Sequence, residues 1–400
     1  MIKVAVFGYG TVGSGVVQVI DDNNRLISDR IGDEIEVKYI LDIRDFPGDK
    51  NEKKIVHDVN IVLDDPEINI ICETMGGTRV AYTYTKSALE KGKSVCTSNK
   101  ELVAAYGPEL LETAKAHNCS YLFEASVGGG IPIIRPMNTS LAPDKIEKIT
   151  GILNGTTNYM LTMMSKDGSS YEDVLKQAQD LGYAESNPEA DVEGYDACRK
   201  IAILASLMTG KTVNYEKIYT EGITKITAKD FEYAKKLNKA IKLLAIAENK
   251  DGELTAMVAP FMIGDEHPLN GVNGVFNGIF VTGNMVNDLM FYGSGAGKLP
   301  TASAVVSDVI ECARTLGRNI PFIWNDEQAS LADCKDSVRS FFVRAKDSSK
   351  DEAKSLFGDV TEVDAAAGEY AFITSKMSER SFDDKIVKLT GVINIIRVED

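Results

Sequence analysis

Histidine is scarce in this chain of 400 residues, with only three present, and they lie far apart in the sequence. None has the spacing of a metal ligand, so we expect no zinc site built from histidine. The six cysteines form no CxxC pair, and several lie inside apolar runs. We interpret them as reduced core thiols of a cytoplasmic protein.

Basic residues are also few, with 44 Lys and Arg against 59 Asp and Glu, which gives a formal net charge of −15. Phosphate contacts need a basic surface, so neither nucleic acid nor an anionic membrane is expected as a partner. Long apolar runs are missing too, since the longest helix-like run, residues 201–208, is too short to cross a bilayer. Met1 leads directly into an apolar strand, without the pattern of a secretory signal.

The chain does have a glycine-rich turn at its start, where residues 2–7 form a short β-branched run. The next residues read G-x-G-x-x-G, with Gly8, Gly10 and Gly13 at the fixed positions and Thr11 and Val12 between them. This order of strand, turn and helix favours dinucleotide binding, because the turn brings backbone N–H groups and a helix N-terminus to a pyrophosphate. The alternative is a glycine-rich turn between core elements.

Strand and helix patterns alternate through the first 130 residues. This alternation predicts an α/β fold, a Rossmann-type doubly wound parallel sheet. The expected further strands are residues 35–41, 68–72, 94–97 and 121–125, and the clearest helices are residues 78–90 and 102–117.

Polar residues follow three of these strands, at the edge where a ligand of such a sheet lies. After the second strand, Asp42 suits a ribose hydroxyl and Arg44 suits a 2′-phosphate, so NAD and NADP both stay open, as does the alternative that they are ordinary strand-end charges. Asp42 lies further from Gly13 in the sequence than the usual ~20 residues. We interpret residues 22–33 as an inserted loop that accounts for the additional length. Thr74 follows the third strand, and Ser98 and Lys100 follow the fourth, where the alternative for Lys100 is a lysine that merely starts a helix.

Two later stretches carry further candidates. The run after the last strand, from Glu124 through three successive glycines, could hold a monovalent cation through oxygen ligands, or it could be a flexible crossover between domains. In an acidic stretch from residue 182, Asp196 and Lys200 share one helix face, just before an apolar run. They are either a surface ion pair or a lysine withdrawn from water that exchanges a proton near neutral pH. The neighbouring carboxylates could hold a substrate ammonium group.

At this point the sequence resembles the homoserine dehydrogenases. The resemblance covers about residues 1–325 and rests on four segments: TSNK at residues 97–100, GTTNY at residues 155–159, the acidic stretch of residues 178–200 and the YGSGAGKLPTASAVV segment at residues 292–306. It implies reversible reduction of L-aspartate 4-semialdehyde to L-homoserine with NADP or NAD, in the synthesis of threonine, methionine and isoleucine.

The resemblance also implies roles for individual residues. Lys200 exchanges a proton with the substrate oxygen, Lys100 polarises that oxygen and Asp196 orients Lys200. The substrate-binding set is Glu185, Asp191, Gly155 and Thr156. The cofactor-binding set is Gly8, Gly10, Thr11, Val12, Gly13, Arg44, Thr74, Ser98, Lys100, Gly182, Gly295 and Gly297. A sodium or potassium site maps onto Glu124, Val127, Gly129 and Ile131.

The tail from about residue 338 has its own pattern, strand, helix, two strands, helix and strand, which is ferredoxin-like and resembles the ACT domain. It lacks the Pro-Gly turn of that domain after Asp347. Two interpretations therefore stay open, an effector site with threonine as candidate and a tail that serves assembly alone.

We predict a dinucleotide-binding domain at residues 1–130, an α+β substrate and dimerisation domain at 131–295, a return helix at 296–330 and the ACT-like domain at 335–400. The expected assembly is a homodimer, with a homotetramer as the alternative. Two other functions compete with homoserine dehydrogenase: another dehydrogenase of the aspartate pathway, and a non-catalytic amino-acid sensor on a dehydrogenase fold. The presence of both Lys100 and Lys200 counts against the sensor.

Overall fold

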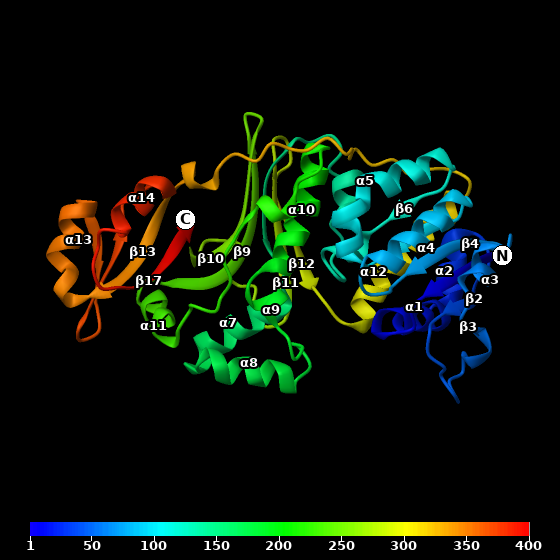
Figure 1. Cartoon of the computed structure of the whole chain (residues 1–400), viewed down its shortest axis with the longest axis horizontal. Coiled ribbons are helices and arrows are strands. Elements are labelled where there is room, and N and C mark those ends of the chain that lie inside the picture. Colours follow the sequence, from blue (N-terminus) through cyan, green and yellow to red (C-terminus); the bar gives the residue numbers. More distant parts are fainter. Residues whose placement is uncertain (400) are drawn as a thin grey trace. The chain divides into compact units, whose positions relative to one another are not determined.

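The computed structural model describes residues 1–399, and the chain divides into two compact units (Figure 1). The first unit contains residues 1–145, 203–213 and 293–329, and the second contains residues 146–202, 214–292 and those from 330 onward. Each unit is described by itself. No helix among the described residues is long and apolar enough to cross a membrane.

The first unit is built on a six-stranded sheet in the order β3-β2-β1-β4-β5-β6. All neighbouring strands are parallel, which confirms the predicted doubly wound sheet. Helix α12 contacts α1, β4 and β5, so a helix from late in the chain covers the sheet made by its beginning. The strands are β1 (Ile2–Phe7), β2 (Ile35–Leu41), β3 (Ile55–Val56), β4 (Ile68–Glu73), β5 (Ser94–Thr97) and β6 (Tyr121–Leu122). The helices are α1 (Thr11–Asp22), α2 (Asn24–Ile31), α3 (Val59–Leu63), α4 (Arg79–Glu90), α5 (Lys100–Ala116), α6 (Ile134–Asn138) and α12 (Lys298–Arg314).

Two local predictions in this unit are wrong. Residues 22–33 are not a loop, because Asn24–Ile31 forms α2, which buries Ile27 and ends at Gly32 in the left-handed conformation. The predicted strand at residues 121–125 stops at Leu122, and Glu124–Ser126 forms a 3-10 turn. The turn forms because backbone N–H groups of residues 133–135 bind the Glu124 carboxylate and pull the chain out of the sheet direction.

The second unit has an eleven-stranded mixed sheet with β12-β11-β7-β9-β10-β17-β13-β15-β14 as its main path. Strands β9 and β10 are buried along most of their length, which explains their nearly continuous apolar sequences. The strands are β7 (Ile146–Ile152), β8 (Tyr219–Thr220), β9 (Lys239–Lys250), β10 (Glu253–Gly264), β11 (Phe276–Gly283), β12 (Asn287–Ser294), β13 (Val338–Lys346), β14 (Val360–Val363), β15 (Glu369–Thr374), β16 (Met377–Ser378) and β17 (Val392–Glu399). The helices are α7 (Gly155–Asp167), α8 (Tyr171–Asp180), α9 (Glu189–Val192), α10 (Tyr195–Thr209, whose end belongs to the first unit), α11 (Ala228–Lys236), α13 (Lys350–Phe357) and α14 (Glu379–Ile386).

The tail of the chain has the predicted ferredoxin-like arrangement. Strands β17, β13, β15 and β14 are neighbours in that order, and an apolar core lies between them and the helices α13 and α14. The sequence did not predict that β17 also pairs in parallel with β10, at Phe261 with Arg397. The tail therefore shares one continuous sheet with the rest of the second unit, as the red and green strands of Figure 1 show.

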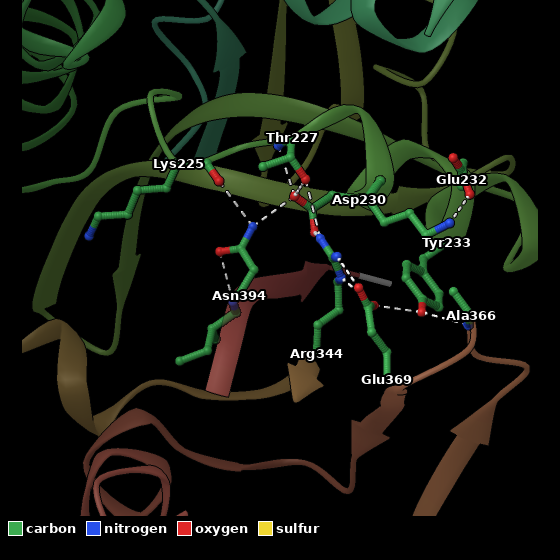
Figure 2. A network of polar contacts seen from close by, with 11 residues as sticks. Lys225, Thr227, Asp230, Glu232, Tyr233, Arg344, Ala366, Glu369 and Asn394 are labelled. Atoms are coloured by element: carbon green, nitrogen blue, oxygen red, sulfur yellow. Dashed lines mark hydrogen bonds and ion pairs between the residues drawn. The ribbon is translucent and has the colours of Figure 1, made fainter. Parts of the chain in front are cut away.

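A buried polar network also joins the tail to α11 (Figure 2). Arg344 on β13 donates to Asp230 over 2.7 Å and to Glu369 over 2.8 Å. Asn394 on β17 donates to Asp230 as well, over 2.8 Å. Both Arg344 and Asp230 are buried, so each charge is compensated by its partners rather than by water.

Candidate active site

The glycine-rich turn has the shape that a dinucleotide pyrophosphate needs. Gly8 adopts a φ of +87°, and the Thr74 hydroxyl donates to its carbonyl oxygen over 2.9 Å. At Gly13 a Cβ atom would lie 1.8 Å from the carbonyl oxygen of Gly8, so no side chain fits between turn and helix. At Gly10 a Cβ atom would meet nothing within 4 Å. The turn is thus closed toward the sheet and open in front of the N-terminus of α1.

Asp42 and Arg44, the two candidates for reading the ribose, bind each other. Arg44 donates from Nε to Oδ1 of Asp42 and from Nη2 to Oδ2, both over 3.0 Å. The Asp42 carboxylate also accepts the backbone N–H of Tyr9, inside the glycine turn, over 2.7 Å. The hydrogen bonds from Arg44 outweigh burial and lower the pKa of Asp42 to about 2. Arg44 itself is exposed.

A hydrogen bond joins the ends of β4 and β5, close in sequence to Lys100. Burial raises the pKa of Glu73 to about 7, and Thr97 donates to its carboxyl oxygen over 2.6 Å. Asn99 caps α5 and donates to the carbonyl oxygen of Gly77 over 2.8 Å. Ser98 precedes this cap. Lys100 is the first residue of α5, at the carboxyl edge of the parallel sheet, where ligands of such folds lie.

Residues 293–297, which we call the return segment, lead into α12 and contact the glycine run that follows β6. Gly130 donates its N–H to the carbonyl oxygen of Ser294 over 3.0 Å. At Gly129 a Cβ atom would lie 2.2 Å from the carbonyl oxygen of Gly295. Gly297, with a φ of +114°, then turns the chain into α12. Gly129 of the predicted cation set and Gly295 of the predicted cofactor set therefore lie together in the first unit.

The Glu124 carboxylate does not face open space. Its oxygens accept the N–H groups of Ile133, Ile134 and Arg135 over 2.6, 2.8 and 2.7 Å. Within residues 1–399 no three His, Cys, Asp or Glu side chains gather as a metal ion would require. A cation at this loop would therefore need backbone carbonyl oxygens, such as those of Val127 and Gly129.

Lys200 lies in the second unit, on α10, and it is 9% exposed. Its Nζ donates to Oδ2 of Asp196 and to the carbonyl oxygen of Leu153, each over 2.8 Å. Asp196 is also buried, at 6% exposure, so the alternative of a surface ion pair is wrong. Withdrawn from water, the pair interacts more strongly than an exposed helix pair does.

Asn154 connects this pair to the acidic stretch, and the sequence did not single it out. Its Nδ2 donates to Asp191 over 2.7 Å and to Asp196 over 2.8 Å. Its Oδ1 accepts the N–H of Thr157 over 2.8 Å and so caps α7. Ionised carboxylates only accept and a backbone N–H only donates, so these contacts fix the amide orientation. The sequence signal was an Asn after a buried strand and three residues before Thr157, which is an N-cap pattern.

The loop that follows α8 brings in the other predicted substrate residues. Thr156 donates its hydroxyl proton to the carbonyl oxygen of Tyr183 over 2.6 Å. The rings of Tyr159 and Tyr183 pack edge to face at 5.0 Å. Gly182 starts the loop with a φ of +74°, and Glu185 follows with an exposed side chain. The loop is thus held by α7, next to Gly155 at the start of that helix.

The structure brings together part of the predicted site within each unit. Asp196, Lys200, Asp191 and Gly155 gather around Asn154 in the second unit. The glycine turn, Arg44, Thr74, Ser98, Lys100, Gly295 and Gly297 belong to the first unit, whereas Gly182 belongs to the second.

Comparison with protein-family models gives two matches. Residues 132–310 match the model described as homoserine dehydrogenase, and residues 8–124 match the model described as homoserine dehydrogenase, NAD binding domain. A homoserine dehydrogenase of Bacillus subtilis is 39% identical over 396 residues, which cover 97% of this chain and 88% of that protein. One from Synechocystis is 46% identical over 319 residues, which cover 77% of this chain and 72% of that protein.

Solved structures agree. A homoserine dehydrogenase from Thiobacillus denitrificans superimposes with a TM-score of 0.89 at 34% identity, covering 100% of this chain and 98% of that one. A hyperthermophilic archaeal homoserine dehydrogenase in complex with NADPH gives a TM-score of 0.67 at 27% identity, covering 80% and 99%. These findings confirm the resemblance that the sequence carried. The chain belongs to the homoserine dehydrogenase family, the NAD(P)-dependent oxidoreductases that interconvert L-aspartate 4-semialdehyde and L-homoserine in the synthesis of the aspartate-family amino acids.

Proposed function

We propose that Lys200 is the acid and base of the reaction and that Asp196 orients it. When homoserine is oxidised, the proton of its hydroxyl group goes to Nζ of Lys200. A hydride leaves the carbon that bears this hydroxyl group and goes to the nicotinamide cofactor. In the reverse direction Lys200 returns a proton to the oxygen of the aldehyde. The observation that carries this proposal is the burial of Lys200, with two of its N–H directions fixed by Asp196 and Leu153. One direction is then left for a substrate oxygen.

The substrate is an amino acid, and the acidic surroundings of Lys200 suit its ammonium group. We assign Glu185 and Asp191 to that group, because a carboxylate is the partner that an ammonium group prefers. Gly155 and Thr156 complete the set at the N-terminus of α7, where backbone N–H groups suit the substrate carboxylate. The bond from Thr156 to Tyr183 supports a further role for Thr156, which is to place the loop that carries Glu185.

The nicotinamide cofactor, when bound, supplies the site that accepts or gives the hydride. For its binding we assign Gly8, Gly10, Thr11, Val12, Gly13, Thr74, Ser98, Gly182, Gly295 and Gly297, while Lys100 both contacts the cofactor and polarises the substrate oxygen. Arg44 favours NADP over NAD, because Asp42 is occupied by Arg44 and Tyr9 and so offers little to a ribose hydroxyl. Arg44 is exposed and carries a planar cation suited to a 2′-phosphate.

We further propose a sodium or potassium ion at the backbone carbonyl oxygens of Glu124, Val127, Gly129 and Ile131. The left-handed φ of Gly129, +59°, and its contact with Gly295 support a loop shaped to turn carbonyl groups inward. The role of such an ion would be to stiffen the loop next to the return segment.

We also propose domain boundaries at residues 130, 295 and 335. The proposed assembly is a homodimer, with a tetramer as the alternative, and the proposed location is cytoplasmic. For the ACT-like tail, a threonine site and an assembly role stay in competition.

The test is the initial rate of L-homoserine oxidation, measured separately with NAD and NADP, with and without potassium or sodium, and with threonine added. We expect turnover that is faster with NADP, and Lys200→Ala should lower it by about 10²- to 10⁴-fold without loss of the fold. Lys211→Ala, which removes an exposed lysine paired with Glu327, is the matched control. Normal turnover of Lys200→Ala would refute the assignment of the base.

A further inference from the structure

A short segment of the second unit, residues 219–223, lies between the tail of the chain and the acidic stretch. We call it the bridging segment. It begins with β8, which pairs in parallel with β10 at Met257 and Val258. The next residue, Glu221, donates its N–H to the carbonyl oxygen of Val258 over 2.8 Å. The bridging segment is therefore fixed on the large sheet.

Its other side is packed against the turn between α9 and α10. Ile223 donates its N–H to the carbonyl oxygen of Val192 over 2.8 Å. At Gly222 a Cβ atom would lie 2.1 Å from that same oxygen, so the two backbones touch and no side chain separates them. At Gly194 a Cβ atom would lie 3.2 Å from the side chain of Thr220. A shift of the bridging segment thus pushes directly on the turn.

The tail holds the bridging segment through one arginine. Arg397, on β17, donates from Nη1 to Glu221 over 2.6 Å. Its other donors bind Glu379 at the start of α14, and its guanidinium lies 4.8 Å from the ring centre of Tyr219. Arg397 is 8% exposed and Glu379 is 4% exposed. Such a buried, multiply bonded ion pair has a defined geometry, unlike a surface pair.

Three further hydrogen bonds connect the turn to Lys200. Val192 follows Asp191, which binds Asn154, and the same Asn154 amide binds Asp196, the partner of Lys200. A continuous series of bonds therefore runs from the strand β17 of the tail to the site.

We propose that Arg397 and Glu221 are positioning residues for homoserine oxidation, which hold the bridging segment against the turn and so fix Asp191 for the substrate ammonium group. The inference rests on the proposed role of Asp191. It gives the ACT-like tail a task in the catalytic unit that needs no effector.

The matched comparison is the network of Figure 2, where Arg344 binds Asp230 on α11 and Glu369 on β15. Glu369 in turn accepts the hydroxyl proton of Tyr233 on α11 over 2.8 Å, so it also attaches the tail to α11. Among the hydrogen bonds of residues 1–399, none joins Asp230 or Glu369 to the turn between α9 and α10. Glu221 and Glu369 are each partners of a buried arginine, and their side chains are similarly accessible, at 26% and 18%. Glu221→Ala and Glu369→Ala therefore disturb the attachment of the tail to a similar degree, but only the first lies on the path to Asp191.

The experiment compares kcat and the KM values for homoserine and cofactor in the full-length enzyme. We expect Glu221→Ala to raise the KM for homoserine about three- to tenfold and to leave the cofactor KM unchanged. Glu221→Gln keeps an acceptor for Arg397 and should recover most of the loss. Glu369→Ala should leave the KM for homoserine at its normal value. An unchanged KM in Glu221→Ala, or an equal rise in Glu369→Ala, would overturn the proposal.

A double variant separates this inference from the proposed function. In an Asp191→Ala background, Glu221→Ala should have no further effect on the KM for homoserine, because the two changes act on one interaction. Additive effects would overturn the route through Asp191. If Asp191→Ala alone leaves that KM unchanged, both the role of Asp191 and the positioning role fail. Loss of turnover in Lys200→Ala would still support the assignment of the base.

Discussion

Oδ2 of Asp196 accepts two hydrogen bonds of 2.8 Å, one from Nζ of Lys200 and one from the amide of Asn154. The two donors approach from different elements, since Lys200 lies one helical turn further along α10 and Asn154 lies at the start of α7. The carboxylate is therefore held from both sides. Because Asn154 binds Asp191 as well, it keeps two negative charges close together beside the lysine.

This arrangement makes Asn154→Ser informative. Serine caps a helix about as well as asparagine, so α7 should keep its N-terminus, while the amide that binds both carboxylates is lost. We expect kcat/KM for homoserine to fall about 10- to 100-fold with little change in the melting temperature. Steady-state kinetics and thermal unfolding of the same preparation check this. A large fall in melting temperature with unchanged kinetics would show that Asn154 serves only the fold.

Arg44→Ala tests the cofactor preference. If Arg44 receives a 2′-phosphate, its loss should lower kcat/KM for NADP about 10- to 100-fold, which corresponds to a charge-assisted hydrogen bond of roughly 1.5–3 kcal/mol. The value for NAD should stay the same or rise, because Asp42 is then released from Arg44. Lys50→Ala, which removes an exposed cation paired with Asp21, serves as the control. Equal losses with both cofactors would contradict the assignment.

The buried carboxyl group of Glu73 predicts that the stability of the fold depends on pH. Burial raises its pKa in the folded chain to about 7, above its unfolded value of 4.5, so the folded state binds more protons between these values. Stability should therefore fall as the pH rises from 4.5 to 7 and stay low above that. Glu73→Gln removes this dependence and should raise the stability at pH 8 by on the order of 1–3 kcal/mol. Urea unfolding at pH 5 and at pH 8 measures both; a pH dependence that persists in the variant would assign it to other groups.

The network of Figure 2 predicts a strong effect of Arg344→Ala on stability. The substitution leaves Asp230, which is fully buried, without its cation. We expect a loss of about 3–5 kcal/mol in the free energy of unfolding. Lys350→Ala breaks an exposed pair with Glu362 on the same domain and should cost less than about 1 kcal/mol. Similar losses for the two variants would mean that the network adds no more than a surface pair.

The parts of the molecule that the sequence predicted are local. The turn from Gly8 to Gly13 follows from neighbouring residues, because a strand, a tight turn and a helix need only each other to be recognised. The Asp196–Lys200 pair follows from helix periodicity alone. Helix α2 was missed although Ile27 and Ile31 have helical spacing and Gly32 is a typical C-terminal residue, because a short helix that buries one side chain gives a weak pattern.

The parts that the sequence did not predict depend on distant residues. The contacts of Asn154 were not predicted, since nothing in its neighbourhood in the sequence shows that residues 191 and 196 approach its amide. The pairing of Phe261 with Arg397 joins strands more than a hundred residues apart. The ion pair of Arg397 with Glu221 joins residues 176 positions apart in the sequence. Such contacts follow from the tertiary arrangement, which the periodicity and spacing of residues in the sequence do not indicate.

The place of β17 has a consequence for how the second unit is made. This strand lies between β10 and β13 in the sheet, yet it is the last of the described strands to be synthesised. During translation one edge of β10 is only partly covered by β8 until residues 392–399 have been synthesised. Folding of the unit should therefore finish only after residues 392–399 have been synthesised, in keeping with its many long-range contacts. A truncation of those few residues would remove an internal strand and not an appendage.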